Sequence, residues 1–141
     1  MLAVAGTRSG LVPHPTAIPS GSVLLVDGPP DMISARSRGL PAVAVGGDHA
    51  WEPAWAGLLA GRRVAVVMDC DPAGRIVAWR IACDLQAAGA IARVIDLAPG
   101  RDDGYDLTDW LAERDSDPPA RLLAALRLLV IDRPAGGRAV L

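Results

Sequence analysis

Two aspartates, Asp69 and Asp71, directly follow Val64–Met68, a run of apolar residues rich in β-branched side chains. The length and composition of this run predict a strand that is buried on both faces. Pro72 comes next and is favoured at the first position of a helix, and apolar residues at helical spacing follow it. Carboxylates at the end of a buried strand can bind Mg²⁺ as hard oxygen ligands. Alternatively, one of them caps the helix while the other is simply solvated.

Two other segments place an aspartate after a predicted strand. Asp27 follows the apolar segment Ser22–Val26, and Asp31 lies four residues later, in the first turn of a predicted helix. The charge of Asp31 suits the positive end of that helix dipole, so a structural role explains it as well as a metal-binding role does. Asp106 follows the strand predicted at Ile91–Leu97, after a polar loop. The chain therefore offers acids from three separate segments.

These acids can meet only if the elements that carry them are suitably arranged. The sequence pattern predicts strands that alternate with helices. The strands are predicted near residues 22–27, 42–45, 63–69 and 91–96, and the helices between them over 29–38, 51–60 and 71–88. Two further helices are predicted over 108–113 and 118–131. Helical crossovers between successive strands favour an α/β fold with a four-stranded, mainly parallel sheet flanked by helices. The carboxyl ends of such strands share one edge of the sheet, which is where ligands bind in open α/β folds.

Four aspartates are expected at that edge, namely Asp27, Asp69, Asp71 and Asp106. Two unpaired carboxylates about 4 Å apart repel each other by roughly 4 kcal/mol at an effective dielectric constant of about 20. A cluster of four is hard to maintain unless a cation offsets the charge. The convergence of these residues therefore favours a metal site over a set of isolated helix caps.

The composition limits the classes of function. A chain of 141 residues with 51% hydrophobic residues is one domain by size and can bury a core. The net charge is −2, so no global basic field points to nucleic acid, and phosphate contacts would come from arginine or backbone N–H groups because the chain has no lysine. Cys70 and Cys83 do not form a CxxC pair, which disfavours a disulfide framework and a zinc site. We expect a cytoplasmic protein, because no signal peptide and no run of about 18 apolar residues is present.

Three acidic motifs stand out in the chain: Asp27-Gly28-x-x-Asp31, Asp69-x-Asp71 followed by Ala73-Gly74-Arg75, and Asp106-x-x-Asp109-Trp110-Leu111. Together they resemble the Toprim domain, the metal-binding module shared by bacterial primases, topoisomerases and some nucleases and repair proteins. The resemblance covers about residues 22 to 112 and is closest to the branch of bacterial primases and phage primase-helicases. It implies a compact, Rossmann-like α/β fold that holds Mg²⁺ or Mn²⁺ at its acidic edge and acts on nucleic-acid phosphates.

The resemblance also implies roles for individual residues. The implied metal ligands are Asp27, Asp31, Asp69, Asp71 and Asp106, and the implied catalytic residues are Asp27, Asp69 and Asp71. The residues expected to face phosphate or nucleic acid are Arg75, Gly28, Gly74 and Asp109.

One departure from the family pattern bears on activity. The first motif of the family normally begins with Glu, which serves as a general acid or base or as a metal ligand, whereas this chain has Asp27. Aspartate is shorter by one methylene, and a misplacement of that size can cost on the order of 10²-fold in rate. The lysine that often precedes the acid of the last motif is replaced by Tyr105.

The resemblance implies a nucleotidyl-transfer module of a primase-like replication protein, with DNA, an RNA primer and nucleotides as ligands. A replicative helicase or neighbouring domains of a longer chain are further candidate partners, and no membrane is expected. The alternative is a non-catalytic module that binds nucleic acid or replication partners. A Toprim module of the nuclease or topoisomerase type is a less favoured interpretation. A topoisomerase would need a tyrosine nucleophile, and the single tyrosine, Tyr105, lies inside an acidic motif. A phosphatase of the haloacid-dehalogenase type is disfavoured because Pro72-Ala73-Gly74 follows the two aspartates.

The chain is expected to have three parts. We predict an N-terminal arm or linker over residues 1–21, a Toprim domain over 22–113, and a C-terminal helix with a loose tail over 114–141.

Overall fold

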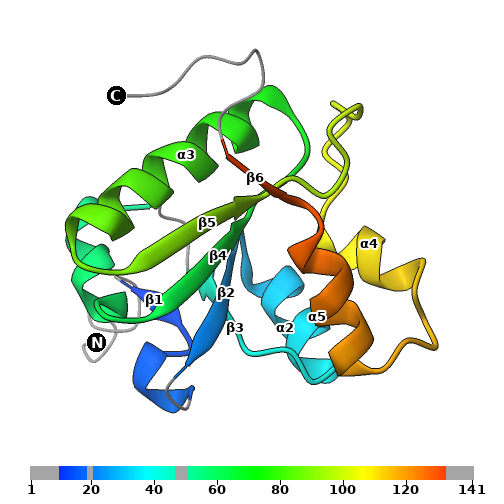
Figure 1. The fold of residues 1–141 in the computed structure, drawn as a ribbon, viewed down its shortest axis with the longest axis horizontal. Helices are drawn as coiled ribbons and strands as arrows, with labels where there is room; N and C mark the ends of the chain where they lie inside the picture. Colours follow the sequence, from blue (N-terminus) through cyan, green and yellow to red (C-terminus); the bar gives the residue numbers. More distant parts are fainter. Residues whose placement is uncertain (1–9, 19–20, 47–50, 133–141) are drawn as a thin grey trace, which may run out of the picture.

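A computed structural model describes residues 10–18, 21–46 and 51–132 of the chain. Figure 1 shows a sheet with helices on both faces. The strands are β1 (Leu11–Val12), β2 (Ser22–Val26), β3 (Ala42–Val45), β4 (Arg63–Val67), β5 (Ile91–Ile95) and β6 (Val130–Ile131). The α-helices are α2 (Pro29–Ser37), α3 (Pro72–Ala87), α4 (Leu107–Ala112) and α5 (Pro119–Arg127), and two 3-10 helices are η1 (Pro15–Ala17) and η2 (Pro53–Leu59).

The sheet has the strand order β1-β3-β2-β4-β5-β6. Its four central strands are parallel, with Val26 opposite Val67 and Val67 opposite Ile95 at their carboxyl ends. The short edge strands β1 and β6 run antiparallel to their neighbours. The predicted α/β fold with a mainly parallel sheet flanked by helices is therefore confirmed.

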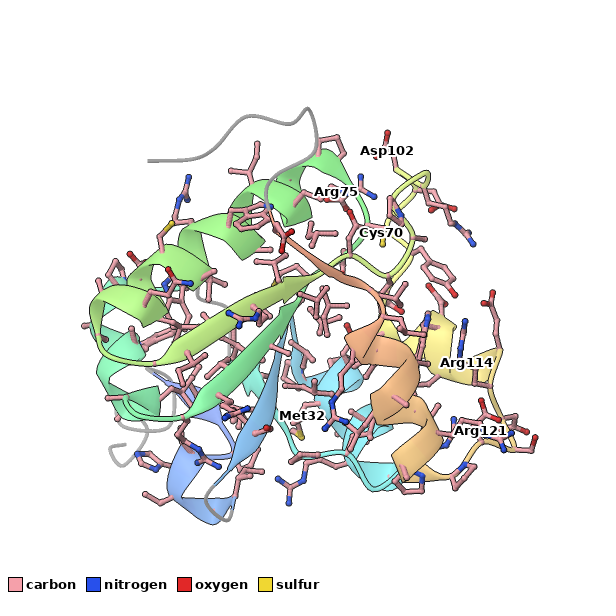
Figure 2. All side chains as sticks on the ribbon, in the orientation of Figure 1. Met32, Cys70, Arg75, Asp102, Arg114 and Arg121 are labelled. Atoms are coloured by element: carbon pink, nitrogen blue, oxygen red, sulfur yellow. The ribbon has the colours of Figure 1, made fainter. Side chains whose placement is uncertain are left out.

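The helices α2, α4 and α5 cover one face of the sheet. Every second residue of the central strands points into this layer, among them Leu24, Val26 and Ile95, and meets buried side chains of α4 and α5. The partly buried Met32 of α2 also packs against this cluster (Figure 2). Because α2 is anchored in this way, its first turn has a defined position at the carboxyl edge of the sheet.

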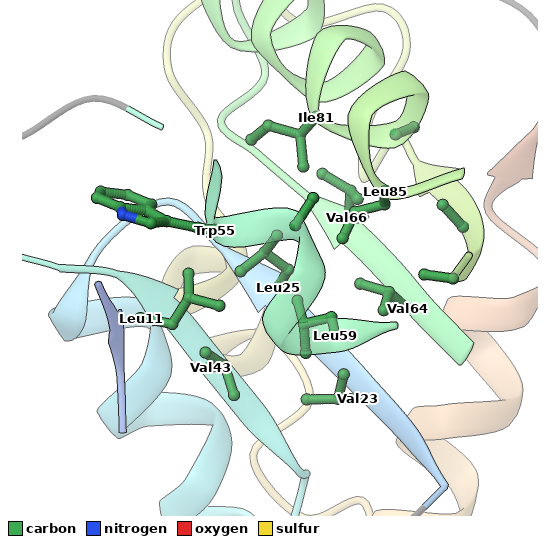
Figure 3. Packing of buried hydrophobic residues seen from close by; sticks show 14 of the residues in the cluster. Leu11, Val23, Leu25, Val43, Trp55, Leu59, Val64, Val66, Ile81 and Leu85 are labelled. Atoms are coloured by element: carbon green, nitrogen blue, oxygen red, sulfur yellow. The ribbon is translucent and has the colours of Figure 1, made fainter. Parts of the chain in front are cut away.

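The opposite face packs against α3 and η2. Ile81 and Leu85 of α3 and Trp55 and Leu59 of η2 cover the alternate strand residues (Figure 3). Burial of both faces explains why β3 and most of β2 and β4 are continuous apolar runs rather than alternating patterns. In β5, by contrast, Ile91 and Arg93 are exposed.

The predicted strand number was wrong, because the sheet has six strands rather than four. The additional strands have two residues each and pair only at the sheet edges. The helix predicted over 118–131 ends at Arg127, and the β-branched pair Val130–Ile131 then pairs with β5. The helix predicted over 51–60 is the 3-10 helix η2, a segment that contains Gly57, a residue that disfavours an α-helix.

The predicted terminal segments lie partly outside the described residues. Within the predicted arm, Leu11 and Ile18 are buried in the core, so residues 10–18 belong to the folded body. The predicted loose tail lies outside the described residues from position 133 onward. None of the helices in the described part of the chain combines the length and apolar character needed to cross a bilayer.

Candidate metal centre

The acidic edge lies where the direction of the chain connections reverses. From β2 the chain passes through α2 to β3 on one side, whereas β4 lies on the other side of β2 and leads into α3. Because α2 and α3 pack on opposite faces, the ends of β2 and β4 lie at the position where open α/β sheets bind ligands. Asp27 follows β2 and Asp69 follows β4, so the two aspartates flank this point.

Three carboxylates converge at this edge. One oxygen atom from each of Asp31, Asp69 and Asp106 lies within 4.8 Å of the others. Asp31 comes from the first turn of α2, Asp69 follows β4, and Asp106 is the N-cap residue of α4. These three residues are called the carboxylate triad below. The triad brings together acids from all three sequence motifs.

Thr108 fixes the position of Asp31. Its hydroxyl donates a hydrogen bond to Asp31 Oδ1 at 2.6 Å, and its backbone N–H donates to the same oxygen at 3.2 Å. Thr108 belongs to α4, so these bonds connect the start of α2 to the start of α4 across 77 positions of sequence. Asp31 is only 5% exposed, yet its second oxygen makes no hydrogen bond within the described residues.

Asp106 and Asp109 form a capping box at the start of α4. The side chain of Asp106 accepts from the backbone N–H of Asp109 at 2.9 Å, and the side chain of Asp109 accepts from the backbone N–H of Asp106 at 3.1 Å. This reciprocal pair holds the Asp106 carboxylate at the helix end. Asp109 itself is exposed.

Asp71 caps α3. Its Oδ1 accepts a hydrogen bond from the backbone N–H of Gly74 at 2.7 Å, and it lies outside the carboxylate triad. Gly74 in turn packs directly against the backbone of Asp69, because a Cβ atom at position 74 would be 2.3 Å from the Asp69 carbonyl oxygen. The start of α3 can approach the triad this closely only with glycine at this position.

Asp27 is exposed beside the triad. After burial, the charge of Asp27 is the largest cause of the raised pKa of Asp69. Gly28 follows as the N-cap of α2 in an extended conformation, and a side chain there would make only ordinary contact with Pro30. The backbone therefore does not require glycine at position 28.

The electrostatics of the triad suit a cation. Burial raises the pKa of Asp69 to about 7, and the nearby charges of Asp27, Asp31 and Asp106 add to that effect. Burial also raises the pKa of Asp31 and of Asp106. No arginine in the described part of the chain forms an ion pair with any of these carboxylates. Oxygen donors held together without a cationic partner are a fitting ligand set for a hard divalent cation.

We expect the metal-free protein to lose stability as the pH rises from about 4 to about 7. The usual pKa of an aspartate is 3.8, whereas that of Asp69 in the folded protein is about 7. Over this interval the folded state keeps a proton that the unfolded chain has lost, so raising the pH favours unfolding. Melting temperatures measured in a chelator should therefore fall across this range, and Asp69→Asn should flatten the curve. An identical pH dependence in wild type and variant would contradict the raised pKa of Asp69.

The sequence reasoning did not identify a second charged cluster beside the triad. Asp96 follows β5, is 7% exposed, and forms an ion pair with Arg75 at 2.9 Å. Arg75 also pairs with Asp102 and donates to the carbonyl oxygens of Ala98 at 3.1 Å and Arg101 at 2.7 Å. In Figure 2, Arg75, Cys70 and Asp102 lie together beyond the end of β5. The available signal is an acid close to the end of a buried strand, but the predicted strand Ile91–Leu97 includes Asp96 itself.

Arg75 holds the loop that leads from β5 to α4. Beyond the arginine contacts, the backbone N–H of Cys70 donates to Tyr105 at 2.8 Å, and that of Gly104 donates to Cys70 at 3.0 Å. The loop is thereby bonded to both the backbone N–H and the backbone carbonyl group of Cys70, the residue that follows Asp69. Because Asp106 comes directly after this attachment, the loop contacts help to set its distance from Asp69. Arg75 is thus engaged with carboxylates in this structure, and its expected contact with phosphate stays a prediction.

No family model matches the sequence, and no curated protein matches it significantly. Among solved structures, this chain is similar to the crystal structure of the Aquifex aeolicus primase, which comprises the zinc-binding and RNA polymerase domains. The TM-score is 0.59 at 24% sequence identity, and the match covers 77% of this chain and 26% of the primase chain. The chain thus spans about a quarter of the length of the protein it matches. At this identity the likeness shows a shared fold.

Proposed function

We propose that this chain is a Toprim-type module of a primase-like replication protein, and that it transfers nucleotidyl groups on nucleic acid with the help of Mg²⁺ or Mn²⁺. The observation that carries the proposal is the carboxylate triad, with Asp27 beside it, at the reversal point of a parallel sheet. Acids gathered from three motifs, with raised pKa values and no cationic partner among the described residues, indicate a divalent cation. The fold shared with the Aquifex aeolicus primase supports the choice of nucleic acid as the substrate.

Asp31, Asp69 and Asp106 are the proposed metal ligands, with Asp27 and Asp71 as further candidates. A bound divalent cation would polarise a phosphoryl group and offset the charge that develops on it. Thr108 and the Asp106–Asp109 capping box keep the triad in place before any ligand arrives. Such preorganisation avoids an ordering cost during the reaction.

Asp27 is the candidate general base or additional ligand, because it is exposed and its charge acts on Asp69. Arg75 would contact a phosphate only after releasing Asp102, whose side chain is 69% exposed. Asp96 would stay paired with Arg75 throughout, since its side chain is only 6% exposed. The proposed ligands are DNA, nucleotides and an RNA primer, and the proposed protein partners are a replicative helicase and neighbouring domains.

Asp27→Asn should abolish nearly all metal-dependent nucleotidyl transfer, and Asp27→Glu should retain or increase it. Asparagine cannot act as a base and is a weaker ligand, whereas glutamate restores the longer reach found in the resembled family. The measurement is primer synthesis on single-stranded DNA with Mn²⁺ and labelled nucleotides, using this chain and any longer polypeptide that contains it. Asp115→Asn, an exposed acid on another part of the surface, is the matched control.

Equal activity in the wild type and in Asp27→Asn would show that Asp27 has no catalytic role. A wild-type protein that binds Mn²⁺ but synthesises no primer would favour the alternative, a non-catalytic module that binds nucleic acid or replication partners. The observation that supports this alternative is Asp27, which is shorter than the glutamate that the family has at this position.

A further inference from the structure

Two hollows open at the amino ends of the central strands. One hollow of about 220 Å³ begins at Ser22, Arg63 and Ile91, the first residues of β2, β4 and β5, and extends between the sheet and α5 as far as Ile95, the last residue of β5. A second hollow of about 400 Å³ continues it toward the end of α2. The two hollows share Ser22 and Pro41 in their linings and are therefore neighbours; together they are called the amino-end groove below. Its bordering elements β2, β4, β5, α2 and α5 are labelled in Figure 1.

Four exposed arginines line the amino-end groove. Arg63, Arg93 and Arg127 line the first hollow, and Arg36 lines the second. Among the described residues none of the four forms an ion pair, and the one side-chain hydrogen bond in the set is a long one, 3.5 Å, from Arg93 to the carbonyl oxygen of Ala92. No described carboxylate lines either hollow. The groove is therefore strongly basic although the whole chain has a net charge of −2.

The four arginines come from four different elements that border the groove. Arg63 and Arg93 lie on neighbouring parallel strands, where Arg63 pairs with Ile91 and Arg93 lies two residues farther on. Both therefore project from the same face of the sheet, the one that α5 borders. Arg127 ends α5, and Arg36 lies in the last turn of α2 on the other side of Ser22. Cations spread over four elements and two neighbouring hollows suit an extended polyanion better than a single small anion.

We infer that the amino-end groove binds a single strand of nucleic acid through its phosphates. Guanidinium groups bind phosphate oxygens through paired hydrogen bonds, and a basic groove that follows the backbone is a common design for sequence-independent binding. The floor is aliphatic, with Leu24 and Ala65, and no aromatic residue of the described chain lines it. Contact with the strand should therefore come from phosphates rather than from base stacking, and affinity should depend strongly on salt.

This inference goes beyond the proposed metal chemistry, because no residue of the triad lines either hollow and phosphate binding there needs no metal. A strand held there would be retained by the module without occupying the acidic edge. An acidic protein segment is the competing occupant of a basic groove with an aliphatic floor. The test below includes it as a separate arm.

The experiment measures the fluorescence anisotropy of fluorescein-labelled oligo-dT of about 20 nucleotides, titrated with the protein in EDTA at several low salt concentrations. The double variant Arg63→Gln/Arg93→Gln should bind on the order of tenfold more weakly than wild type. For single strands, each lost phosphate contact reduces the slope of log affinity against log salt by about 0.7, so the slope should fall by about 1.4.

The matched control is Arg80→Gln/Arg121→Gln, which removes the same charge from exposed sites on α3 and α5 outside the groove and should change affinity less than about twofold. Melting temperatures check that all variants are folded.

Equal losses in the two double variants, or no binding by the wild type, would overturn the inference. A labelled oligo-glutamate peptide that binds through Arg63 and Arg93 while oligo-dT does not would overturn it in favour of an acidic protein segment. Asp69→Asn separates this inference from the proposed function, because it should abolish the metal response and leave oligo-dT binding intact or slightly stronger.

Discussion

Asp69→Asn is expected to abolish the rise in melting temperature that Mg²⁺ or Mn²⁺ produces in the wild-type protein. A cation that binds only the folded state at 100 times its Kd stabilises the fold by about 2.7 kcal/mol. Asp69 contributes a central oxygen of the carboxylate triad, so replacing its charge with an amide should remove most of that effect. In the absence of metal, the variant should be at least as stable as wild type at neutral pH, because the substitution removes a repelling charge. Thermal unfolding with and without Mn²⁺ measures both effects.

The control for this experiment is Asp115→Asn, which removes an exposed carboxylate outside the triad and should keep the full metal response. Asp71→Asn separates a capping role from a ligand role, because asparagine caps helices about as well as aspartate. A reduced metal response with unchanged metal-free stability would identify Asp71 as a ligand. An Asp69→Asn variant that responds to Mn²⁺ as strongly as wild type would show that the cation binds elsewhere.

Gly74→Ala is expected to destabilise the protein by about 3 kcal/mol and to weaken the metal response as well. Overpacking of this kind typically costs about 1–3 kcal/mol. We expect the upper end, because the new Cβ would be 2.3 Å from the carbonyl oxygen of Asp69, a backbone atom that cannot rotate away. Relief of the clash requires the start of α3 to move away from β4, and that movement displaces Asp69. Urea unfolding measures the loss of stability.

Helix propensity predicts the opposite sign for this substitution, since alanine is favoured over glycine in a helix by about 1 kcal/mol. A lower free energy of unfolding in Gly74→Ala would therefore indicate the clash with Asp69, whereas a higher one would indicate that helix propensity dominates. Gly100→Ala is the control, because a Cβ there would have no atom within 4 Å. A Gly74→Ala protein as stable as wild type would contradict the close packing of α3 against Asp69.

The central part of the fold could be predicted because its signals are local. β3 and most of β2 and β4 are continuous apolar runs, and proline or glycine marks the ends of the helices α2 and α3. The edge strands could not be predicted, because two residues are too few to show a period. Val130–Ile131 extended a helical pattern in sequence, and only pairing with β5 makes it a strand.

The acids at the carboxyl edge could be predicted from sequence, but the contacts that hold them could not. Asp69 and Asp106 each follow a strand pattern, and a parallel sheet brings strand ends together. The hydrogen bond from Thr108 to Asp31 links positions 77 residues apart, and a local sequence pattern cannot predict a contact at that separation. Arg75 was expected to face phosphate, whereas its ion pair with the buried Asp96 depends on how the β5–α4 loop folds back over α3.

The most direct test of the metal centre is a crystal structure of the protein soaked in Mn²⁺, with anomalous diffraction recorded at the manganese edge. We predict an anomalous peak coordinated by the carboxylate oxygens of Asp31, Asp69 and Asp106, with Asp27 adjacent. A strong peak bound only by other groups, such as Asp102 and Asp103 of the β5–α4 loop, or no peak at the triad at saturating Mn²⁺, would contradict the proposed metal centre and the function built on it.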